Sequence, residues 1–296
     1  MKPLLSALTL AVLCTAQAAT AQESPTLKKI KDTGTIALGH RESSIPFSYY
    51  DDKQQVIGYS HELMLKVVDA IKAELKLAKL DTKLMPVTSA NRITLVQNGS
   101  VDIECGSTTN NSERQKQVAF SNSIFVIGTK LMTKKTSGIN DFADLAGKNV
   151  VTTAGTTSER LIRKMNEDKK MGMNIISAKD HGESFLTLET GRAVAFMMDD
   201  ALLYGEMAKA KKPGDWAVVG TAQSKEAYGC MLRKDDPGFK KVVDAALAKA
   251  MSTGEAEKIY GKWFMNPIPP KGLNLGMPLS DEMKALYKAP NDKAYE

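Results

Sequence analysis

The sequence predicts an α/β protein of two lobes, in which each lobe is a mostly parallel sheet flanked by helices. Three observations support this fold class. Short β-type segments alternate with helical segments, which favours parallel strands with helices on the sheet faces. The alternation occurs in two separate sets along the 296 residues. Two unusually long extended segments, residues 121–135 and 226–234, flank the second set.

The first set of elements covers the N-terminal third of the mature chain. A helix is predicted at residues 60–79, because apolar residues recur there every three to four positions. In order, this set consists of a strand (TIALG), a loop or hairpin (PFSYYDD with VIGYS), the helix at 60–79, a strand (DTKLMPV), a short helix from Asn91 and a strand (VDIEC).

The second set lies between the two long extended segments. Its predicted elements are NVVTT, a helix from Thr157, NIIS, a helix from about Gly182, VAFMMD, a helix from Asp200, and WAVVG. Both flanking segments exceed the usual strand length of about 5–6 residues. We therefore expect them to cross between the lobes as a hinge. Lobe 1 would comprise residues 26–127 with 229–296, and lobe 2, residues 128–228, would be inserted into it.

The chain after residue 234 is predicted to be mainly helical. Helices are expected at residues 236–252 and 254–264, with one more short helix near residues 280–287. The segment between them is rich in Pro, Asn and Lys, which is typical of an irregular tail.

Residues 1–21 are predicted to be an export signal that is cleaved. A short apolar core ends at Cys14, and small residues follow with the Ala-x-Ala spacing of a cleavage site. The later sequence has no apolar run of the roughly 20 residues that a membrane span needs. We therefore expect an exported protein and leave these residues out of the fold.

Export affects how the cysteines are interpreted. Loss of Cys14 with the signal leaves Cys105 and Cys230, both in predicted strands. In an oxidising compartment these two can form a disulfide. Two buried free thiols remain the alternative.

The charge and motif content excludes several classes of protein. The formal net charge is +6, but the lysines are scattered and no aromatic–basic repeat is present, so we expect no nucleic-acid partner. The segment GTTSE lacks the spacing of a P-loop or dinucleotide fingerprint, and the cysteines lack histidines at metal-ligand spacing. We therefore expect no cofactor and no metal.

Polar residues gather directly after the predicted strands, where ligands bind in open α/β sheets. They comprise three arginines, a histidine, several hydroxyls and an acid. Arginine binds a carboxylate through two parallel hydrogen bonds, whereas an ammonium needs a carboxylate with neutral acceptors. The set therefore suits a ligand with two carboxylates and one ammonium. Its members are Arg41, Ser89, Arg92, Ser107, Thr109, Arg114, Thr157, His181 and Asp199.

Each of these residues also has a purely structural explanation. Arg114 could lie exposed on a helix, and His181 could belong to a surface turn. Thr157 and Asp199 could be ordinary helix caps. Their shared position after strands is what indicates a common site.

The segment GSTTNNSERQKQVAFS carries a family pattern in which glycine and hydroxyl residues precede Glu-Arg and a Phe-Ser pair. Over essentially all the mature chain, the sequence resembles the periplasmic amino-acid-binding proteins (solute-binding protein family 3) that feed ABC transporters. The blocks GHRESSIPFSYYD, ISAKDHGESF, GRAVAFMMDDALL and EAYGCMLRKDDP look closest to members that bind glutamate and aspartate. The resemblance implies a type II periplasmic-binding-protein fold and a monomer in the periplasm. It also implies capture of L-glutamate or L-aspartate by lobe closure and delivery to an inner-membrane ABC permease complex.

The resemblance also implies which residues hold the α-amino-acid end of the ligand. Arg114 would bind the α-carboxylate, assisted by Thr109 and Thr157. Asp199 and Ser107 would hold the α-ammonium.

The remaining four residues would receive the side-chain carboxylate of the ligand. They are Arg41, Ser89, Arg92 and His181. An opposite charge beside a histidine favours its protonated form, so we expect ligand binding to raise the pKa of His181.

Two alternative functions remain open at this point. The first is a ligand-sensing module for a membrane receptor. The second is an enzyme on the same fold, with His181 and Asp199 as an acid–base pair. The sequence lacks a nucleophile elbow, so we expect no catalytic residues.

Overall fold

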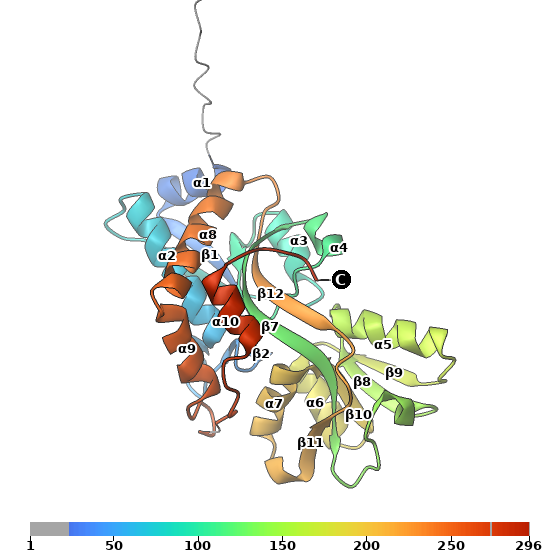
Figure 1. Cartoon of the computed structure of the whole chain (residues 1–296). Coiled ribbons are helices and arrows are strands. Elements are labelled where there is room, and N and C mark those ends of the chain that lie inside the picture. The colour runs from blue at the N-terminus through green and yellow to red at the C-terminus, as the bar shows by residue number, and fades with distance from the viewer. Residues whose placement is uncertain (1–23, 273, 296) are drawn as a thin grey trace, which may run out of the picture.

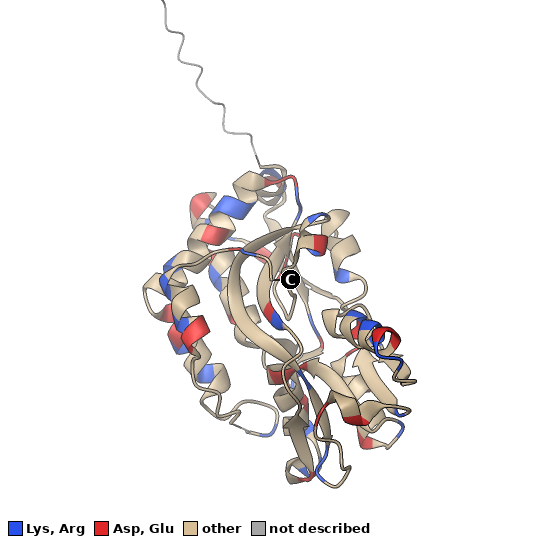
Figure 2. Cartoon of the chain, turned by 45° about the vertical axis from the view of Figure 1, so that its right-hand side comes forward, with Lys and Arg blue, Asp and Glu red and all other residues tan. Residues whose placement is uncertain are grey.

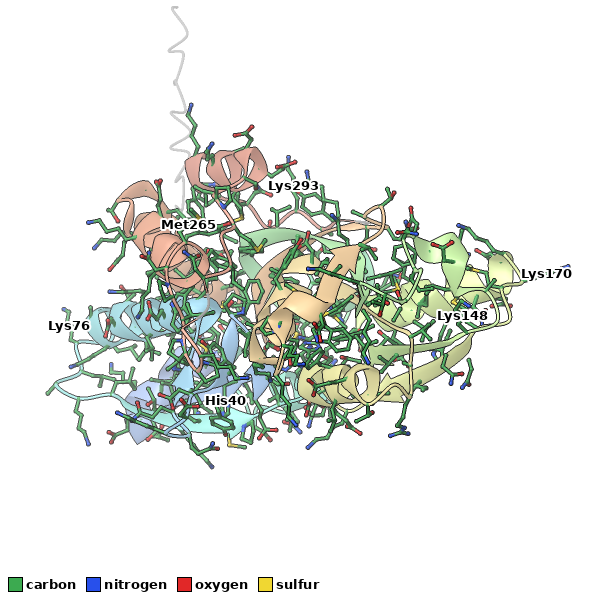
Figure 3. All side chains as sticks on the ribbon, turned by 90° about the horizontal axis from the view of Figure 1, so that it is seen from below. His40, Lys76, Lys148, Lys170, Met265 and Lys293 are labelled. Carbon is green, nitrogen blue, oxygen red and sulfur yellow. A yellow bond between two sulfur atoms is a disulfide. The ribbon has the colours of Figure 1, made fainter. Side chains whose placement is uncertain are left out.

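The computed structural model describes residues 24–272 and 274–295, and it shows two lobes joined by two long strands (Figure 1). The predicted export signal lies outside the described residues. Figure 3 shows Lys76 at the outer end of one lobe and Lys148 and Lys170 at that of the other.

The first lobe is built on a sheet with the strand order β5-β1-β6-β12-β7. Strands β5 and β6 run parallel to β1, and Leu38 of β1 pairs with both Leu84 and Ile103. Strand β12 runs antiparallel to its neighbours β6 and β7. The bounds are β1 (Thr35–His40), β5 (Asp81–Pro86), β6 (Ile103–Glu104), β7 (Ala119–Lys134) and β12 (Lys225–Leu232). A small separate sheet contains β2 (Ser43–Ser44), β3 (Ser48–Tyr50) and β4 (Val56–Ile57), so the predicted hairpin is present.

Helices cover the faces of this sheet. They are α1 (Pro25–Thr33), α2 (Tyr59–Glu74), α3 (Arg92–Gln97), α4 (Ser112–Gln115), α8 (Pro237–Ser252), α9 (Glu255–Phe264) and α10 (Asp281–Lys288). Helix α2 ends five residues earlier than predicted, because Lys76 adopts a left-handed φ of 52° that the helix cannot continue through. Helix α1 was not predicted, although Ser24 caps it and Gly34 ends it.

The second lobe contains a sheet with the order β7-β10-β8-β9, with β11 paired to β7. Strand β8 is parallel to β9 and β10, whereas β7 is antiparallel to β10 and β11. The strands are β8 (Asn149–Thr153), β9 (Asn174–Ala178), β10 (Ala195–Asp199) and β11 (Trp216–Val219). The helices are α5 (Thr157–Asp168), α6 (His181–Glu189), α7 (Asp200–Lys209) and two 3₁₀ turns, η1 (Phe142–Leu145) and η2 (Pro213–Asp215).

Strand β7 belongs to both lobes, whereas β12 pairs with β6 and β7 of the first lobe's sheet. The first half of the 16-residue β7 pairs with β12, and its second half pairs with β10 and β11. The two strands separate near the pair Gly128–Lys225. A disulfide between Cys105 and Cys230, with an S–S distance of 2.05 Å, joins the end of β6 to β12. The disulfide prediction is therefore confirmed over the free-thiol alternative.

The main core contains a cluster of aromatic rings under the two long strands. Phe125 of β7 packs with ring centroids 4.8 Å from Phe47 and 4.9 Å from Phe264. Tyr228 of β12 joins this cluster at 5.1 Å from Phe47. Because these residues are fully or almost fully buried, the strands that connect the lobes rest on a rigid base.

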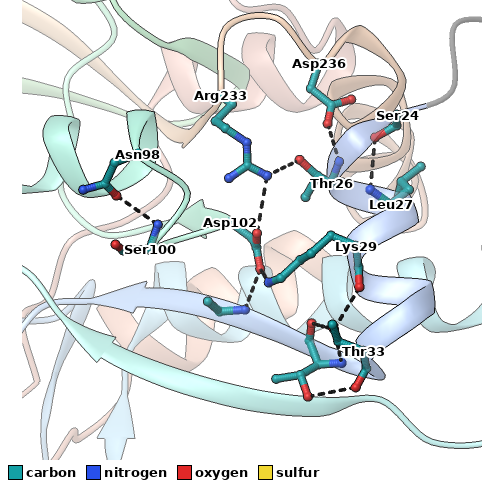
Figure 4. A network of polar contacts seen from close by, with 12 residues as sticks. Ser24, Thr26, Leu27, Lys29, Thr33, Asn98, Ser100, Asp102, Arg233 and Asp236 are labelled. Atoms are coloured by element: carbon teal, nitrogen blue, oxygen red, sulfur yellow. Dashed lines mark hydrogen bonds and ion pairs between the residues drawn. The ribbon is translucent and has the colours of Figure 1, made fainter.

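A buried polar network fastens α1 to the first lobe (Figure 4). The side chain of Asp102 accepts hydrogen bonds from Lys29 Nζ over 2.5 Å and from the Ala37 N–H over 2.8 Å. Arg233, which follows β12, contacts both Asp102 and Thr26. The carboxylate of Asp102 therefore joins helix α1, at the start of the lobe, to Arg233, which follows the last strand of its sheet.

The surface carries both signs of charge on the same helices (Figure 2). Lys164 pairs with Asp168 on α5, and Lys28 pairs with Asp32 on α1. The net charge of +6 is thus distributed over mixed surfaces.

Candidate ligand-binding site between the lobes

Two arginines lie on the first-lobe side of the site. Arg41 follows β1 directly, and Arg92 is the first residue of α3, a few residues after β5. Arg41 Nη1 donates to Ser107 Oγ over 3.3 Å, and Arg92 Nη1 donates to the Ser107 carbonyl over 3.0 Å. Ser89 is buried, and within the described chain its hydroxyl has no hydrogen-bond partner. The carbonyl of Ser107, a residue that the resemblance assigns to the ligand's ammonium, therefore already accepts from Arg92.

Arg114 connects the two lobes. It lies on the one-turn helix α4, where Asn111 accepts a hydrogen bond from its N–H over 2.9 Å. Its Nη1 donates to the Thr109 carbonyl over 2.8 Å, and its Nη2 donates to the Gly155 carbonyl of the second lobe over 3.3 Å. Arg114 is 6% exposed, so it does not lie on a solvated helix face.

The three guanidinium groups are buried cations, and the acids near them, among them Glu104, Asp199 and Glu226, act on them only from beyond ion-pair distance within the described residues. Among the residues that the structure describes, no carboxylate oxygen lies within the 4.0 Å of an ion pair from Arg41, Arg92 or Arg114. Burial, together with the neighbouring charge of Arg92, lowers the pKa of Arg41 to about 10 and that of Arg114 to about 9. A buried charge is costly unless it is paired, so this cluster favours an anion.

His181 completes the cationic side of the site from the second lobe. It is the first residue of α6 and is 1% exposed. Its Nδ1 lies 2.8 Å from Thr153 Oγ1, while Nε2 has no partner within the described residues. Burial, and then the charges of Arg41 and Arg92, hold the pKa of His181 well below 6.5. The ring is therefore neutral, and Nε2–H can donate when Nδ1 accepts.

Asp199 supplies the acid, at the end of β10. Its Oδ1 lies 3.2 Å from Thr129 Oγ1 and 3.4 Å from Ser158 Oγ, and its Oδ2 accepts from the Tyr228 hydroxyl. Burial, and then the negative charge of Glu226, raise the pKa of Asp199 to about 8. An ammonium beside this group would favour its ionised form. The side chain does not cap α7.

Thr157 is also not a helix cap. The side chain of Thr156 caps α5, accepting from the Glu159 N–H over 3.0 Å. The Thr157 hydroxyl is therefore free to donate to Glu226 Oε2, over 2.8 Å. The Thr109 hydroxyl donates to the same oxygen. These three residues line a cavity of about 410 Å³ beside α4, α5 and β12.

The lobes touch at several points around the site. Gly155 has a left-handed φ of +76°, and a Cβ there would lie 2.6 Å from Ala90 Cα of the first lobe. The Gly182 N–H donates to Ser43 Oγ over 3.3 Å. The predicted site residues are thus enclosed between two lobes in contact.

The site combines both signs of charge. Burial, and then the charges of Arg41 and Arg92, lower the pKa of His181, and the acids Glu226 and Asp199 oppose the lowering of the pKa of Arg114 by burial. A zwitterion with a second anionic group matches this distribution. Within residues 24–272 and 274–295, no group of three or more His, Cys, Asp or Glu side chains could hold a metal ion. The same residues include no helix with the length and apolar character of a membrane span.

Sequence reasoning missed several polar residues of the site. These are Thr108, Thr129, Ser158, Glu226 and Tyr228. Thr129, Glu226 and Tyr228 do not follow a predicted strand but lie within the two long strands. The position after a strand therefore could not identify them. The isolated acid in EAYGC, within an otherwise apolar segment, was the available signal for Glu226.

Comparison with known families gives one match over most of the chain. The profile described as "Bacterial extracellular solute-binding proteins, family 3" matches residues 36–266. A solved structure of an ancestral arginine-binding protein bound to arginine is similar, with a TM-score of 0.71 and 27% identity. That similarity covers 78% of this chain and 98% of the other.

Curated relatives are similar over nearly the full length. The L-glutamate/L-aspartate-binding protein of Pseudomonas aeruginosa (strain PAO1) is 66% identical over 99% of this chain and 97% of its own. The glutamate/aspartate import solute-binding protein of Escherichia coli (strain K12) is 61% identical over 99% of this chain and 98% of its own.

Proposed function

The chain belongs to the bacterial extracellular solute-binding proteins, family 3, and we propose that its interlobe site captures L-glutamate or L-aspartate for an ABC import system. The curated relatives at 61% and 66% identity are named as binding proteins for these amino acids. The chain is accordingly a binding protein and not an enzyme. The type II periplasmic-binding-protein fold, with two strands between the lobes, suits this role.

The unpaired arginines are the observation that carries the proposal. Arg41, Arg92 and Arg114 are each at least 94% buried, and the described residues place no carboxylate within ion-pair distance of them. A ligand with two carboxylates would neutralise these cations through bidentate hydrogen bonds. A neutral or basic side chain on the ligand would leave Arg41 and Arg92 buried, with no carboxylate of the described chain at ion-pair distance and only more distant acids, chiefly Glu104, to offset their charge.

We assign the ligand's α-end to residues near Glu226 and β10. Arg114, with Thr109 and Thr157, binds the α-carboxylate. Asp199 and the Ser107 carbonyl hold the α-ammonium. The Ser107 carbonyl can do this while accepting from Arg92, because a carbonyl oxygen has two lone pairs.

We assign the ligand's side-chain carboxylate to the opposite end of the site. It is held by Arg41, Ser89, Arg92 and His181. Three of these residues have a buried polar atom without a hydrogen-bond partner in the described chain: Ser89 Oγ, Arg92 Nε and His181 Nε2. A carboxylate accepts from several donors, so it would satisfy them together.

Binding is coupled to closure because the site residues come from both lobes. We propose that residues 26–127 with 229–296 form lobe 1, and that residues 128–228 form lobe 2. The boundaries then fall where β7 and β12 separate, near Gly128 and Lys225. A ligand that touches both lobes stabilises the closed form through its greater affinity for that form.

The proposed location is the periplasm, and the proposed partner is an inner-membrane ABC permease complex that receives the ligand from a monomer. Support comes from the family's description as extracellular and from the relatives' names as import components. The predicted signal at residues 1–21 agrees with this location.

Calorimetric titration of ligand-stripped protein tests the proposal. L-glutamate and L-aspartate should bind tightly. L-glutamine should bind at least about 100-fold more weakly, because it loses charge-assisted hydrogen bonds. L-arginine should give no measurable heat. Equal binding of glutamine would refute the assignment of Arg41, Arg92 and His181 to a carboxylate.

A further inference from the structure

Glu226 is a buried acid that lies between the lobes. It is the second residue of β12, pairs with Ile127 of β7, and is 5% exposed. Within the described residues no Lys, Arg or His nitrogen lies within the 4.0 Å of an ion pair from its carboxylate. A buried carboxylate in this position must be stabilised by hydrogen bonds instead.

Hydroxyl groups from both lobes supply those hydrogen bonds. Thr109, after β6, and Thr157, at the start of α5, both donate to Oε2 of Glu226. Ser224 donates to Oε1 over 3.1 Å. One carboxylate oxygen thus holds one hydroxyl from each side of the site.

The same two threonine hydroxyls are assigned above to the ligand's α-carboxylate. A hydroxyl carries a single proton and can donate to only one acceptor at a time. Thr109 and Thr157 therefore cannot serve both Glu226 and the ligand. Glu226 offers them a carboxylate, the same chemical group that the ligand would present.

We propose that Glu226 is a residue of the ligand site that competes with the ligand's α-carboxylate for the hydroxyl protons of Thr109 and Thr157. The proposal rests on the proposed function, because it takes the α-carboxylate position from it. Glu226 then lowers the affinity for α-carboxylates and limits how long the closed complex persists. Such a competitor suits a protein that must release its ligand.

Besides accepting hydrogen bonds, Glu226 affects the site through its negative charge. It opposes the fall in the pKa of Arg114, and it contributes to the raised pKa of Asp199. A second anion beside Arg114 is therefore repelled by Glu226. Glu226→Gln removes this charge and keeps the side-chain size. It should therefore reduce both the repulsion of the ligand and the competition for the threonine hydroxyls.

The test compares wild-type protein with Glu226→Gln by calorimetric titration of L-glutamate and glutarate. Glutarate keeps both carboxylates and lacks the α-ammonium, so it isolates the competition between carboxylates. We expect Glu226→Gln to lower the Kd of both ligands about tenfold, because two hydrogen bonds to a charged carboxylate become weaker bonds to a neutral amide oxygen, and these are easier to break. Stopped-flow release of L-glutamate should slow by a similar factor.

Glu113→Gln is the matched control. Glu113 lines the same cavity and pairs with Lys116, and within the described part of the chain it makes no hydrogen bond to either threonine. Glu113→Gln removes the same charge. Because Glu113 is exposed, the Kd values for L-glutamate and glutarate should stay within about twofold of the wild-type values. Thermal unfolding checks that each variant folds. If Glu226→Gln does not fold, Glu226→Met takes its place in the test.

The outcomes separate the alternatives. Unchanged affinity for both ligands would overturn the proposal and leave Glu226 a structural residue. Weaker L-glutamate binding with unchanged glutarate binding would also overturn it, because Glu226 would then hold the α-ammonium. If wild-type protein binds neither L-glutamate nor L-aspartate, the proposed function itself fails, whatever the Glu226 variants do.

Discussion

Replacing Gly155 by alanine should block complete closure of the lobes. The new Cβ would lie 2.6 Å from Ala90 Cα and 2.7 Å from Ala90 N, both backbone atoms of the first lobe. Ordinary contact begins at 3.4 Å, so the lobes would have to separate by about 0.8 Å at this point. Backbone atoms within a packed lobe cannot move away as the end of a flexible side chain can.

The consequence for binding can be worked out from Arg114. Its Nη2 lies 3.3 Å from the Gly155 carbonyl, and the same shift would carry this pair to about 4 Å, beyond hydrogen-bonding distance. Ligand groups bridging the lobes would be displaced equally. Losing one hydrogen bond to a charged group costs about 1.5–3 kcal/mol, so Kd should rise about 10- to 150-fold.

Gly172→Ala is the control for backbone strain. Gly172 has a φ of +64°, is also in the second lobe, and has nothing within 4 Å of the position of a Cβ. Both variants should lose about 1–2 kcal/mol of stability from the left-handed φ. Only Gly155→Ala should lose affinity for L-glutamate in calorimetry. Equal affinities of Gly155→Ala and wild type, or equal losses in both variants, would refute the closure argument.

Three further outcomes are expected. The pKa of Asp199 is raised to about 8 and an ammonium would lower it, so binding should release a proton below pH 8. Kd for L-glutamate should therefore fall as pH rises from 6 to 8, and Asp199→Asn should abolish this slope; calorimetry in two buffers measures the proton release. The sequence predicts that ligand binding raises the pKa of His181, but burial and then the charges of Arg41 and Arg92 hold it well below 6.5. We therefore expect His181→Ala to weaken binding without changing the pH profile between 6 and 8, and a changed profile there would restore the first expectation. The disulfide closes a loop with a sequence separation of 125 residues. In the chain-entropy treatment, replacing Cys105 and Cys230 by alanine should therefore lower the free energy of unfolding by about 5 kcal/mol. An unchanged midpoint of denaturant unfolding would contradict this stabilisation.

Most of the fold could be predicted because the local signals agree with the tertiary structure. The helix from Thr157 begins where a threonine cap and a polar first turn predict it, and both long extended segments are single strands. The end of α2 could not be predicted from periodicity. Leu75 continues the apolar spacing, but Lys76 turns the backbone away.

The candidate site was predictable only in its strand-end residues. Parallel strands bring their carboxyl ends together, so Arg41 and Asp199 could be selected without coordinates. Glu226 does not follow a strand. An acid at the start of an apolar extended segment is unusual, but this pattern does not indicate which hydroxyls the side chain contacts. The unpaired state of the arginines likewise depends on distances between both lobes.

The network around Asp102 has a consequence for how the protein is made. Arg233 and Asp236 contact Thr26 across 207 and 210 residues of sequence, so the first lobe has a high contact order. A nascent chain cannot complete this lobe until the residues around Arg233 and Asp236 have been synthesised. The earlier chain must remain incompletely packed until then, because the strand β12 that lies between β6 and β7 is still missing. This delay would favour the export that we propose, since the native core cannot form before most of the chain is available to the translocation machinery.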